Sequence, residues 1–326
     1  MTTSNANRVL MTPLARRTRA YFAPVDRATS TPAIFDPGKH GAFPTDLPPP
    51  GWVDLGLIDN FRRTPGTRIN SIRGGPGGTP VAQFRSQLDA RVELDFRDWG
   101  KLQMALAAGS QHMNVLAVQP DAAAVPSGGA AIAAVPVLNG STASEILLDS
   151  VALGSFAIGE LIVADLDYQQ QTGYVGSGIP AAYVKDPADV QHDVDYIRRV
   201  SFNVARVQQK TATSLLLAQP LLAGAPSPGA AVQKVVAFVD REAGRFFHEW
   251  SALFVVENES GGRINFYYPR LQPASGAQEA KIEFAAPVEA YALHASFIAL
   301  PYRDANDGEE ILCYRSYFPA SAAAVY

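Results

Sequence analysis

The most regular pattern in the chain is an alternation of polar and apolar residues over residues 81–97. Every second side chain is polar, namely Gln83, Arg85, Gln87, Asp89, Arg91, Glu93, Asp95 and Arg97. The interleaved residues are apolar except for one serine, namely Ala82, Phe84, Ser86, Leu88, Ala90, Val92, Leu94 and Phe96. A period of two is typical of a β-strand with one face in a core and the other in water. The pattern predicts one unusually long strand, or two shorter strands separated by a bulge near Gln87.

A short amphipathic helix is predicted directly after this strand, within residues 98–109. Asp98 is a residue type that caps helix N-termini, and Gly109 suits the left-handed position that follows a helix. Apolar side chains recur at helical spacing in between, so one helix face should pack on the sheet. The side chains expected in the core of the strand–helix unit are Phe84, Leu88, Val92, Leu94, Phe96, Trp99, Leu102 and Leu106.

The remaining sequence predicts a mainly β protein with an inserted domain. Residues 1–50 are rich in Pro, Gly, Thr and Ser and read as an extended N-terminal arm, although residues 18–25 could form a first strand. Short strand-like runs at close spacing predict a small all-β barrel. The expected parts are an N-terminal arm (1–50), a discontinuous β-sandwich (51–140 and 239–326) and an inserted β-barrel (141–238), with a low-complexity linker at 120–140.

Composition narrows the function classes. The chain has 326 residues, 47% of them hydrophobic, which is ample for a core. Its net charge of −4 argues against a dedicated nucleic-acid binder, which would be basic. The single cysteine, Cys313, excludes an intramolecular disulfide and a cysteine zinc cage. No apolar run approaches the length of a membrane-spanning helix, and we expect no membrane association and no secretory signal.

The residues give no positive case for an enzyme. Paired acids occur at Asp165/Asp167, Glu93/Asp95 and Asp304/Asp307, but the second pair lies in a mixed row with arginines. The oxygen-rich residues 304–310 lack the spacing of a calcium loop and predict a hairpin turn. His112 is expected in a loop as a hydrogen-bonded structural residue. We therefore expect no catalytic, cofactor-binding or metal-binding residues and no cofactor.

The strand and helix together resemble a known unit. Val92, Leu94 and Phe96, followed by Trp99, Leu102, Leu106 and Gly109, resemble the strand–helix unit of phage tail tube (major tail) proteins. Residues 51–61 (GWVDLGLIDNF) and 264–272 (INFYYPRLQ) are also similar to that family. The resemblance covers roughly residues 52–109 and 245–318, and it rests on pattern without a diagnostic motif.

The resemblance implies a structural virion protein without catalytic activity, located in the virion tail after assembly in the bacterial host cytoplasm. Family members form β-sandwich subunits that assemble into hexameric rings, which stack into a tube for DNA ejection. The implied partners are further copies of the chain, the tape-measure protein and passing DNA in the lumen without sequence-specific binding, and other tail proteins such as a sheath. On this interpretation the lumen-facing residues are Gln83, Arg85, Gln87, Asp89, Arg91, Glu93 and Asp95.

Two other interpretations stay open at this point. The inserted barrel and the aromatic strands could form a carbohydrate- or surface-binding module of a phage tail or a related injection machine. Alternatively, the chain could be a hydrolase that uses Asp165 and Asp167.

Overall fold

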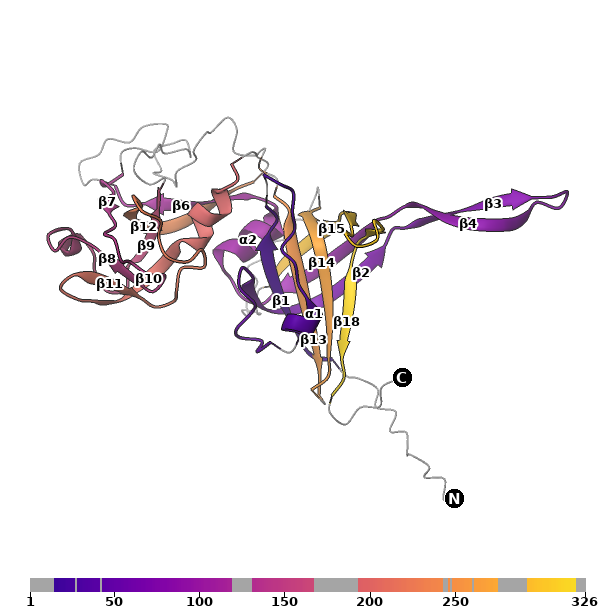
Figure 1. The fold of residues 1–326 in the computed structure, drawn as a ribbon, viewed down its shortest axis with the longest axis horizontal. Coiled ribbons are helices and arrows are strands. Elements are labelled where there is room, and N and C mark those ends of the chain that lie inside the picture. The colour runs from indigo at the N-terminus through magenta and orange to yellow at the C-terminus, as the bar shows by residue number, and fades with distance from the viewer. Residues whose placement is uncertain are drawn as a thin grey trace, which may run out of the picture. The chain divides into compact units, whose positions relative to one another are not determined.

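The structure is a computed structural model that describes residues 15–26, 28–41, 43–118, 131–166, 193–242, 246, 248–259, 261–274 and 292–320. The fold is mainly β, as the sequence predicts, and it divides into two compact units (Figure 1). Unit 1 comprises Met1–Val25, Thr31–Trp99 and His248–Tyr326. Unit 2 comprises Asp26–Ser30 and Gly100–Phe247.

Unit 1 is built around one antiparallel sheet in the order β13-β1-β2-β5-β15-β14-β18. Its strands are β1 (Ala15–Pro24), β2 (Val53–Pro65), β5 (Ala90–Phe96), β13 (Trp250–Asn258), β14 (Arg263–Pro273), β15 (Leu293–Ala299) and β18 (Tyr314–Phe318). Because β13 pairs with both β1 and β14, the sheet closes on itself. β15 and β18 share the other edge of β14, at its C-terminal and N-terminal ends respectively.

Aromatic side chains fill the interior of this closed sheet. Phe22 on β1 lies at the centre, with ring centroids 5.5–6.4 Å from its four aromatic neighbours. Those neighbours come from three other strands and are Phe96, Trp250, Phe254 and Phe297. Tilted and edge-on ring pairs of this kind stabilise a core beyond the area that they bury.

The described residues of the expected N-terminal arm belong instead to unit 1, except for residues 26 and 28–30, which belong to unit 2. β1 is an internal strand of the sheet, and residues 31–52 cover the sheet's outer side through Phe35, Phe43 and Trp52. These side chains pack with Tyr21, Leu253, Val255 and Tyr267 because β1, β13 and β14 are apolar on both faces. A one-turn helix, α1 (Pro37–His40), begins there after its N-cap Asp36. Residues 1–14 lie outside the described part of the chain.

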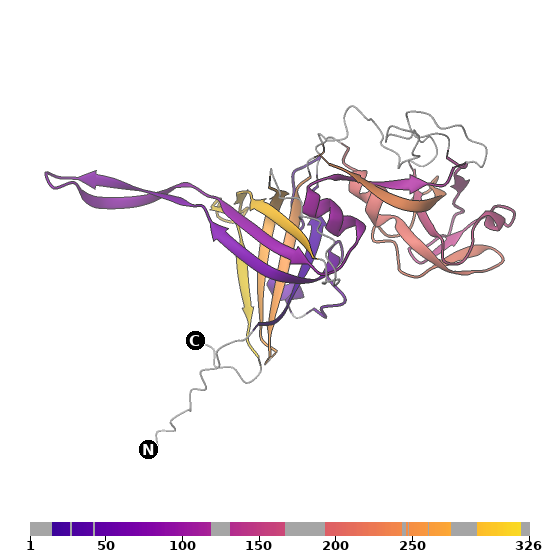
Figure 2. The same ribbon diagram turned by 180° about the vertical axis from the view of Figure 1, so that it is seen from behind.

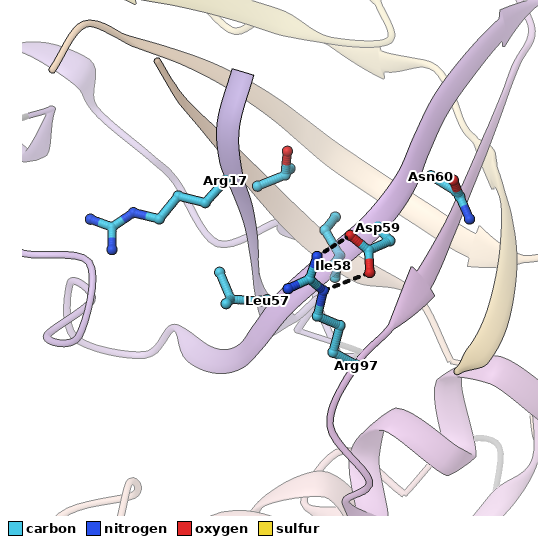
Figure 3. A pocket seen from close by; sticks show the side chains of 7 residues that line it. Arg17, Leu57, Ile58, Asp59, Asn60 and Arg97 are labelled. Atoms are coloured by element: carbon cyan, nitrogen blue, oxygen red, sulfur yellow. Dashed lines mark hydrogen bonds and ion pairs between the residues drawn. The ribbon is translucent and has the colours of Figure 1, made fainter. Parts of the chain in front are cut away.

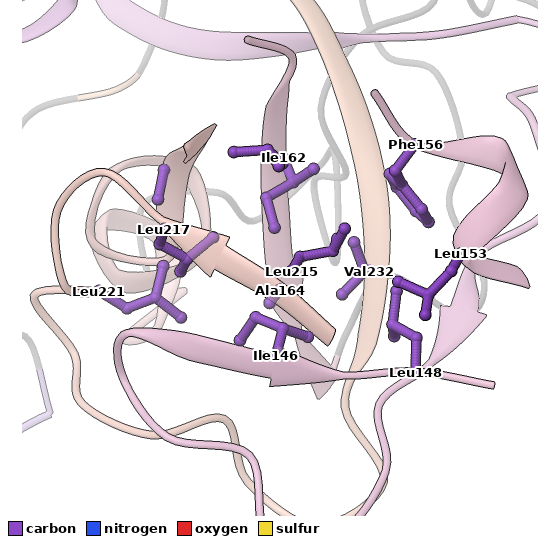
Figure 4. Close-up of a cluster of buried hydrophobic side chains, with 12 residues drawn as sticks. Ile146, Leu148, Leu153, Phe156, Ile162, Ala164, Leu215, Leu217, Leu221 and Val232 are labelled. Atoms are coloured by element: carbon purple, nitrogen blue, oxygen red, sulfur yellow. The ribbon is translucent and has the colours of Figure 1, made fainter. Parts of the chain in front are cut away.

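Unit 2 holds a second antiparallel sheet in the order β6-β12-β9-β10-β11-β8, with β7 also paired to β12. Its elements are α2 (Lys101–Ala108), β6 (Gln111–Leu116), β7 (Val135–Pro136), β8 (Glu145–Leu147), η1 (Ala152–Ser155), β9 (Leu161–Asp165), η4 (Arg198–Phe202), β10 (Val204–Lys210), β11 (Ser214–Leu217) and β12 (Ala231–Arg241). Aliphatic side chains from most of these strands form its core, with Phe156 at one end (Figure 4).

The second unit is larger than the expected insert. It begins at Gly100 where residue 141 was expected, and it ends at Phe247 where residue 238 was expected. The reason is long-range pairing, because β6 is joined to β12 from Gln111↔Arg241 onward. The described part of residues 120–140 does not form the expected linker. It belongs to the sheet instead, because β7 pairs with β12 and Ala131 forms a β-bridge with Val118. Residues 119–130 lie outside the described chain.

The predicted helix exists as α2, but it belongs to unit 2 and contacts β6 and β12. Gly109 adopts the expected left-handed conformation, with φ 63°. The cap residue is Gly100 and not Asp98, and no side chain caps the helix. Leu102 and Leu106 are buried, but in unit 2 and not in unit 1. Trp99 is 61% exposed, so its expected core position is wrong.

Candidate interaction surface

The long alternating stretch forms two strands in the structure, which is the second of the two possibilities that the sequence allows. β4 (Thr79–Gln87) and β5 are separated by Leu88 and Asp89. Opposite this break the neighbouring strand β2 ends at Pro65, and the N–H of Gly66 donates to the Asp89 carbonyl oxygen. Gly66 lies so close to Asp89 that an added Cβ would stand 3.1 Å from a carboxylate oxygen.

β5 behaves as its pattern predicts. It pairs with β2 on one side and β15 on the other, and Ala90, Val92, Leu94 and Phe96 are completely buried. Three of the seven side chains expected to face a lumen lie on the outer face of this strand. They make polar contacts there: Arg91 Nε lies 3.3 Å from Glu93, Arg91 contacts the Ser296 hydroxyl at 2.8 Å, and Asp95 contacts His294 Nδ1 at 2.8 Å.

β4 lies in a different environment. Within the described residues it pairs only with β3 (Arg68–Gly74), and the two strands form a hairpin that projects from the sheet of unit 1 (Figures 1 and 2). We call this hairpin, residues 68–87, the arm, and it is distinct from the N-terminal arm expected at residues 1–50. All of β4 and nearly all of β3 are exposed. Phe84 was expected in the core but is 50% exposed, because neither face of the two-stranded arm is covered within the described chain.

The seven expected lumen residues therefore do not form one row. Gln83, Arg85 and Gln87 lie on the arm, Asp89 lies at the junction, and the other three lie on β5. Leu88, the remaining expected core residue, is only half-buried at the base of the arm.

The two faces of the arm differ in polarity. Residues paired across an antiparallel ladder share a face, and the pairs Asn70↔Phe84 and Ile72↔Ala82 place three apolar side chains together. We call Ile72, Ala82 and Phe84 the apolar face. The opposite face carries the pairs Ile69↔Arg85 and Ser71↔Gln83 together with Val81, so it mixes two exposed apolar side chains with polar and charged ones. The amphipathic pattern thus continues along the arm, although no core covers its apolar side.

Charge also distinguishes the arm from the chain as a whole. The arm carries Arg68, Arg73 and Arg85 and no acidic residue, whereas the chain has a net charge of −4. Its tip is the glycine-rich turn after Gly74, in which Gly75 and Gly78 have positive φ angles. An open hollow at the arm's base has a volume of about 540 Å³ and is lined by Arg85, Gln87 and Leu88. Glu309 and Glu310 also line it, and they belong to a second hairpin within residues 302–311.

That hairpin corresponds to the expected turn at residues 304–310. β16 (Tyr302–Arg303) pairs with β17 (Glu310–Ile311), and Gly308 has the positive φ of a tight turn. The Tyr314 hydroxyl and backbone N–H of Asn306 donate to Asp304 and hold the pKa of its carboxyl below the usual range. Asp304 and Asp307 accept hydrogen bonds within the turn, whereas Glu309 and Glu310 are exposed.

A smaller cavity of about 160 Å³ lies where β2 shifts register beside β1 and β5 (Figure 3). Arg97 donates two hydrogen bonds of 2.6 Å to Asp59, which lower the pKa of that carboxyl. Arg17 pairs with Glu257, and Asn60 has a φ of 52°, as expected at a bulge. Each of the two arginines that line the cavity is paired with an acid. The cavity is therefore a consequence of the bulge in β2.

The acids considered for catalysis are engaged in structural contacts where they are described. Asp165 is buried and contacts Arg198 at 2.5 Å and the Asn203 amide, while Asp167 lies outside the described residues. Within the described ranges, no three His, Cys, Asp or Glu residues are grouped as metal ligands. Burial raises the pKa of the Cys313 thiol to about 11, so it stays protonated at neutral pH.

His112 lies in β6 and not in a loop, fully buried, with Nε2 2.8 Å from the Ser201 hydroxyl. Among the helices in the described part of the chain, none has the length and apolar character needed to span a membrane. No model of a protein family matches this chain, and no curated protein matches its sequence.

Proposed function

We propose that this chain is a structural subunit that assembles with copies of itself into stacked rings, and that these rings form the tube of a phage tail. The observation that carries the proposal is the arm. A lone two-stranded hairpin is marginally stable in water, and this one also exposes an apolar face. A partner that covers the apolar face would stabilise the arm and remove that face from water.

Two features favour a second copy of the chain as that partner. The resemblance to tail tube proteins covers the strands that flank the arm, and a repeated subunit supplies one partner surface for each arm. The arm is also basic, while the hairpin at residues 304–310 presents Asp307, Glu309 and Glu310 on the same unit. Arginines of one copy and acids of the next would attract each other across such a contact.

The outer face of β5 supports the conduit role. Arg91 and Arg97, the residue directly after the strand, flank Glu93 and Asp95, so two positive and two negative charges balance. A strongly basic wall would hold DNA through its phosphates, whereas a balanced polar wall lets DNA and a tape-measure protein pass. In this proposal the chain has no catalytic activity, and the tube resides in the virion tail.

Electron microscopy combined with light scattering tests the proposal. The purified full-length chain should form rings or tubes that grow with protein concentration. The double variant Ile72→Asp/Phe84→Asp places two charges on the apolar face and should shift the chain to a folded monomer, with assembly weakened at least tenfold.

Val151→Asp is the matched control, because Val151 is an exposed apolar residue of unit 2. This variant should assemble like the unchanged chain. A chain that stays monomeric at every concentration, or arm variants that assemble normally, would overturn the proposal.

A further inference from the structure

Lys101 and Asn114 meet inside unit 2. Lys101 begins α2 and Asn114 lies on β6, and the Lys101 Nζ is 3.0 Å from the Asn114 Oδ1. Nζ also donates to the Val200 carbonyl oxygen. Asn114 is completely buried, and the ring of Phe238, its partner across the β6–β12 ladder, lies 4.5 Å from Nζ. Phe238 is itself 40% exposed and Lys101 is half-buried, so the contact lies at the edge of the interior of unit 2.

This environment favours the neutral form of the amine. Burial lowers the pKa of Lys101 to about 7, so a large share of the side chains carry no charge at neutral pH. A neutral amine has a lone pair and can act as a nucleophile. The Asn114 Cγ is bonded to Oδ1 at about 1.2 Å, so this carbonyl carbon lies within about 4.2 Å of the amine nitrogen.

We propose that Lys101 and Asn114 become joined by an intramolecular isopeptide bond. The Nζ lone pair attacks Cγ, a bond between Nζ and Cγ forms, and the bond between Cγ and Nδ2 breaks. Nδ2 takes up the proton that Nζ loses and leaves as ammonia. The step needs no oxidant, reductant or added reagent, and fixed neighbours replace the encounter of two free groups.

The bond would give unit 2 a covalent tie that its cysteine content does not allow. The single Cys313 of the chain lies in unit 1, so no disulfide can link α2 to the sheet of unit 2. An isopeptide bond between the first residue of α2 and β6 would constrain the unfolded chain and would resist reducing agents.

Intact-mass spectrometry of the folded, full-length chain tests the proposal. The mass should be lower than that of the sequence by one ammonia. Lys101→Arg should restore the full mass, because a guanidinium is not a nucleophile at neutral pH. Lys210→Arg is the matched control, since Lys210 also donates to a backbone carbonyl in unit 2 and should leave the ammonia loss unchanged.

Peptide mapping of the unchanged chain gives a test that does not depend on how the variants fold. Trypsin should fail to cleave after the acylated Lys101, and chymotrypsin, which cuts between the two residues, should release a branched peptide. A chain of full mass that trypsin cleaves after Lys101 would overturn the proposal. An ammonia loss that persists in Lys101→Arg would also overturn it and would point to a succinimide at an asparagine.

Discussion

β4 and β5 come from one uninterrupted alternating stretch, yet their apolar side chains have opposite surroundings. Phe96 on β5 is completely buried among Phe22, Ile58 and Leu293, while Phe84 on β4 is half exposed on the arm. β5 lies between two strands, one of which comes from the C-terminal third of the chain, and β4 has a single partner next to it in sequence. The same binary pattern thus describes a core strand and an exposed strand of a hairpin, and the neighbouring strands decide which.

Hydrogen exchange should show the largest contrast between the two strands. In the monomer, amides of β5 should exchange only through global unfolding, at a cost of about 5–15 kcal/mol, while amides of the arm should open at nearly no cost. Mass spectrometry of exchanged peptides measures both. In the assembled state the arm should become protected, and an arm that is equally protected in the monomer would contradict the comparison.

Matched substitutions of the two phenylalanines should give the next largest effect. Phe96→Ala removes a ring from the interior of unit 1 and should lower the free energy of unfolding by about 3–5 kcal/mol. Phe84→Ala removes an exposed ring and should change it by no more than about 0.5 kcal/mol in the monomer. Chemical denaturation of both variants measures the difference, and similar losses would show that the arm packs on unit 1.

Acid titration should give the smallest effect and should again separate the two regions. Arg97 keeps the pKa of Asp59 low, so the folded state favours the ionised carboxylate beside β5. This contribution is fully present above the ordinary aspartate pKa of about 3.9 and is lost as the pH falls through the lower folded value. It should be well below the effect of Phe96→Ala, because both side chains are about half exposed and water screens the pair.

Denaturation midpoints at pH 6 and pH 3, compared with those of Asp59→Asn, measure this contribution. The variant should lose less stability on acidification than the unchanged chain, and an equal loss would contradict the assignment. The arm contains no Asp, Glu or His, so its own opening should not change over this range.

The two units also show where long-range pairing overrides a local interpretation. Helix α2 follows β5 after only a few residues, and its apolar spacing correctly predicts a buried face with Leu102 and Leu106. That face is buried in unit 2. The strands β6 and β12 pair although they lie near opposite ends of residues 100–247, and the helix packs on both of them. The strand character of β6 and β12 was missed, although Val235, Val236 and Val239 of β12 are a recognisable β-branched signal.

The sequence by itself determined the β class, the alternation that orients β5 and gives the arm two unlike faces, the glycine-rich tip and the left-handed Gly109. These features depend on backbone preferences and on a period of two, which are local properties. Only the tertiary structure decided that Ala90–Phe96 has a core, that residues 79–87 have none, and that Asn114 lies beside Lys101. Burial and side-chain contact depend on strands that arrive from far along the chain, and no local pattern encodes their arrival.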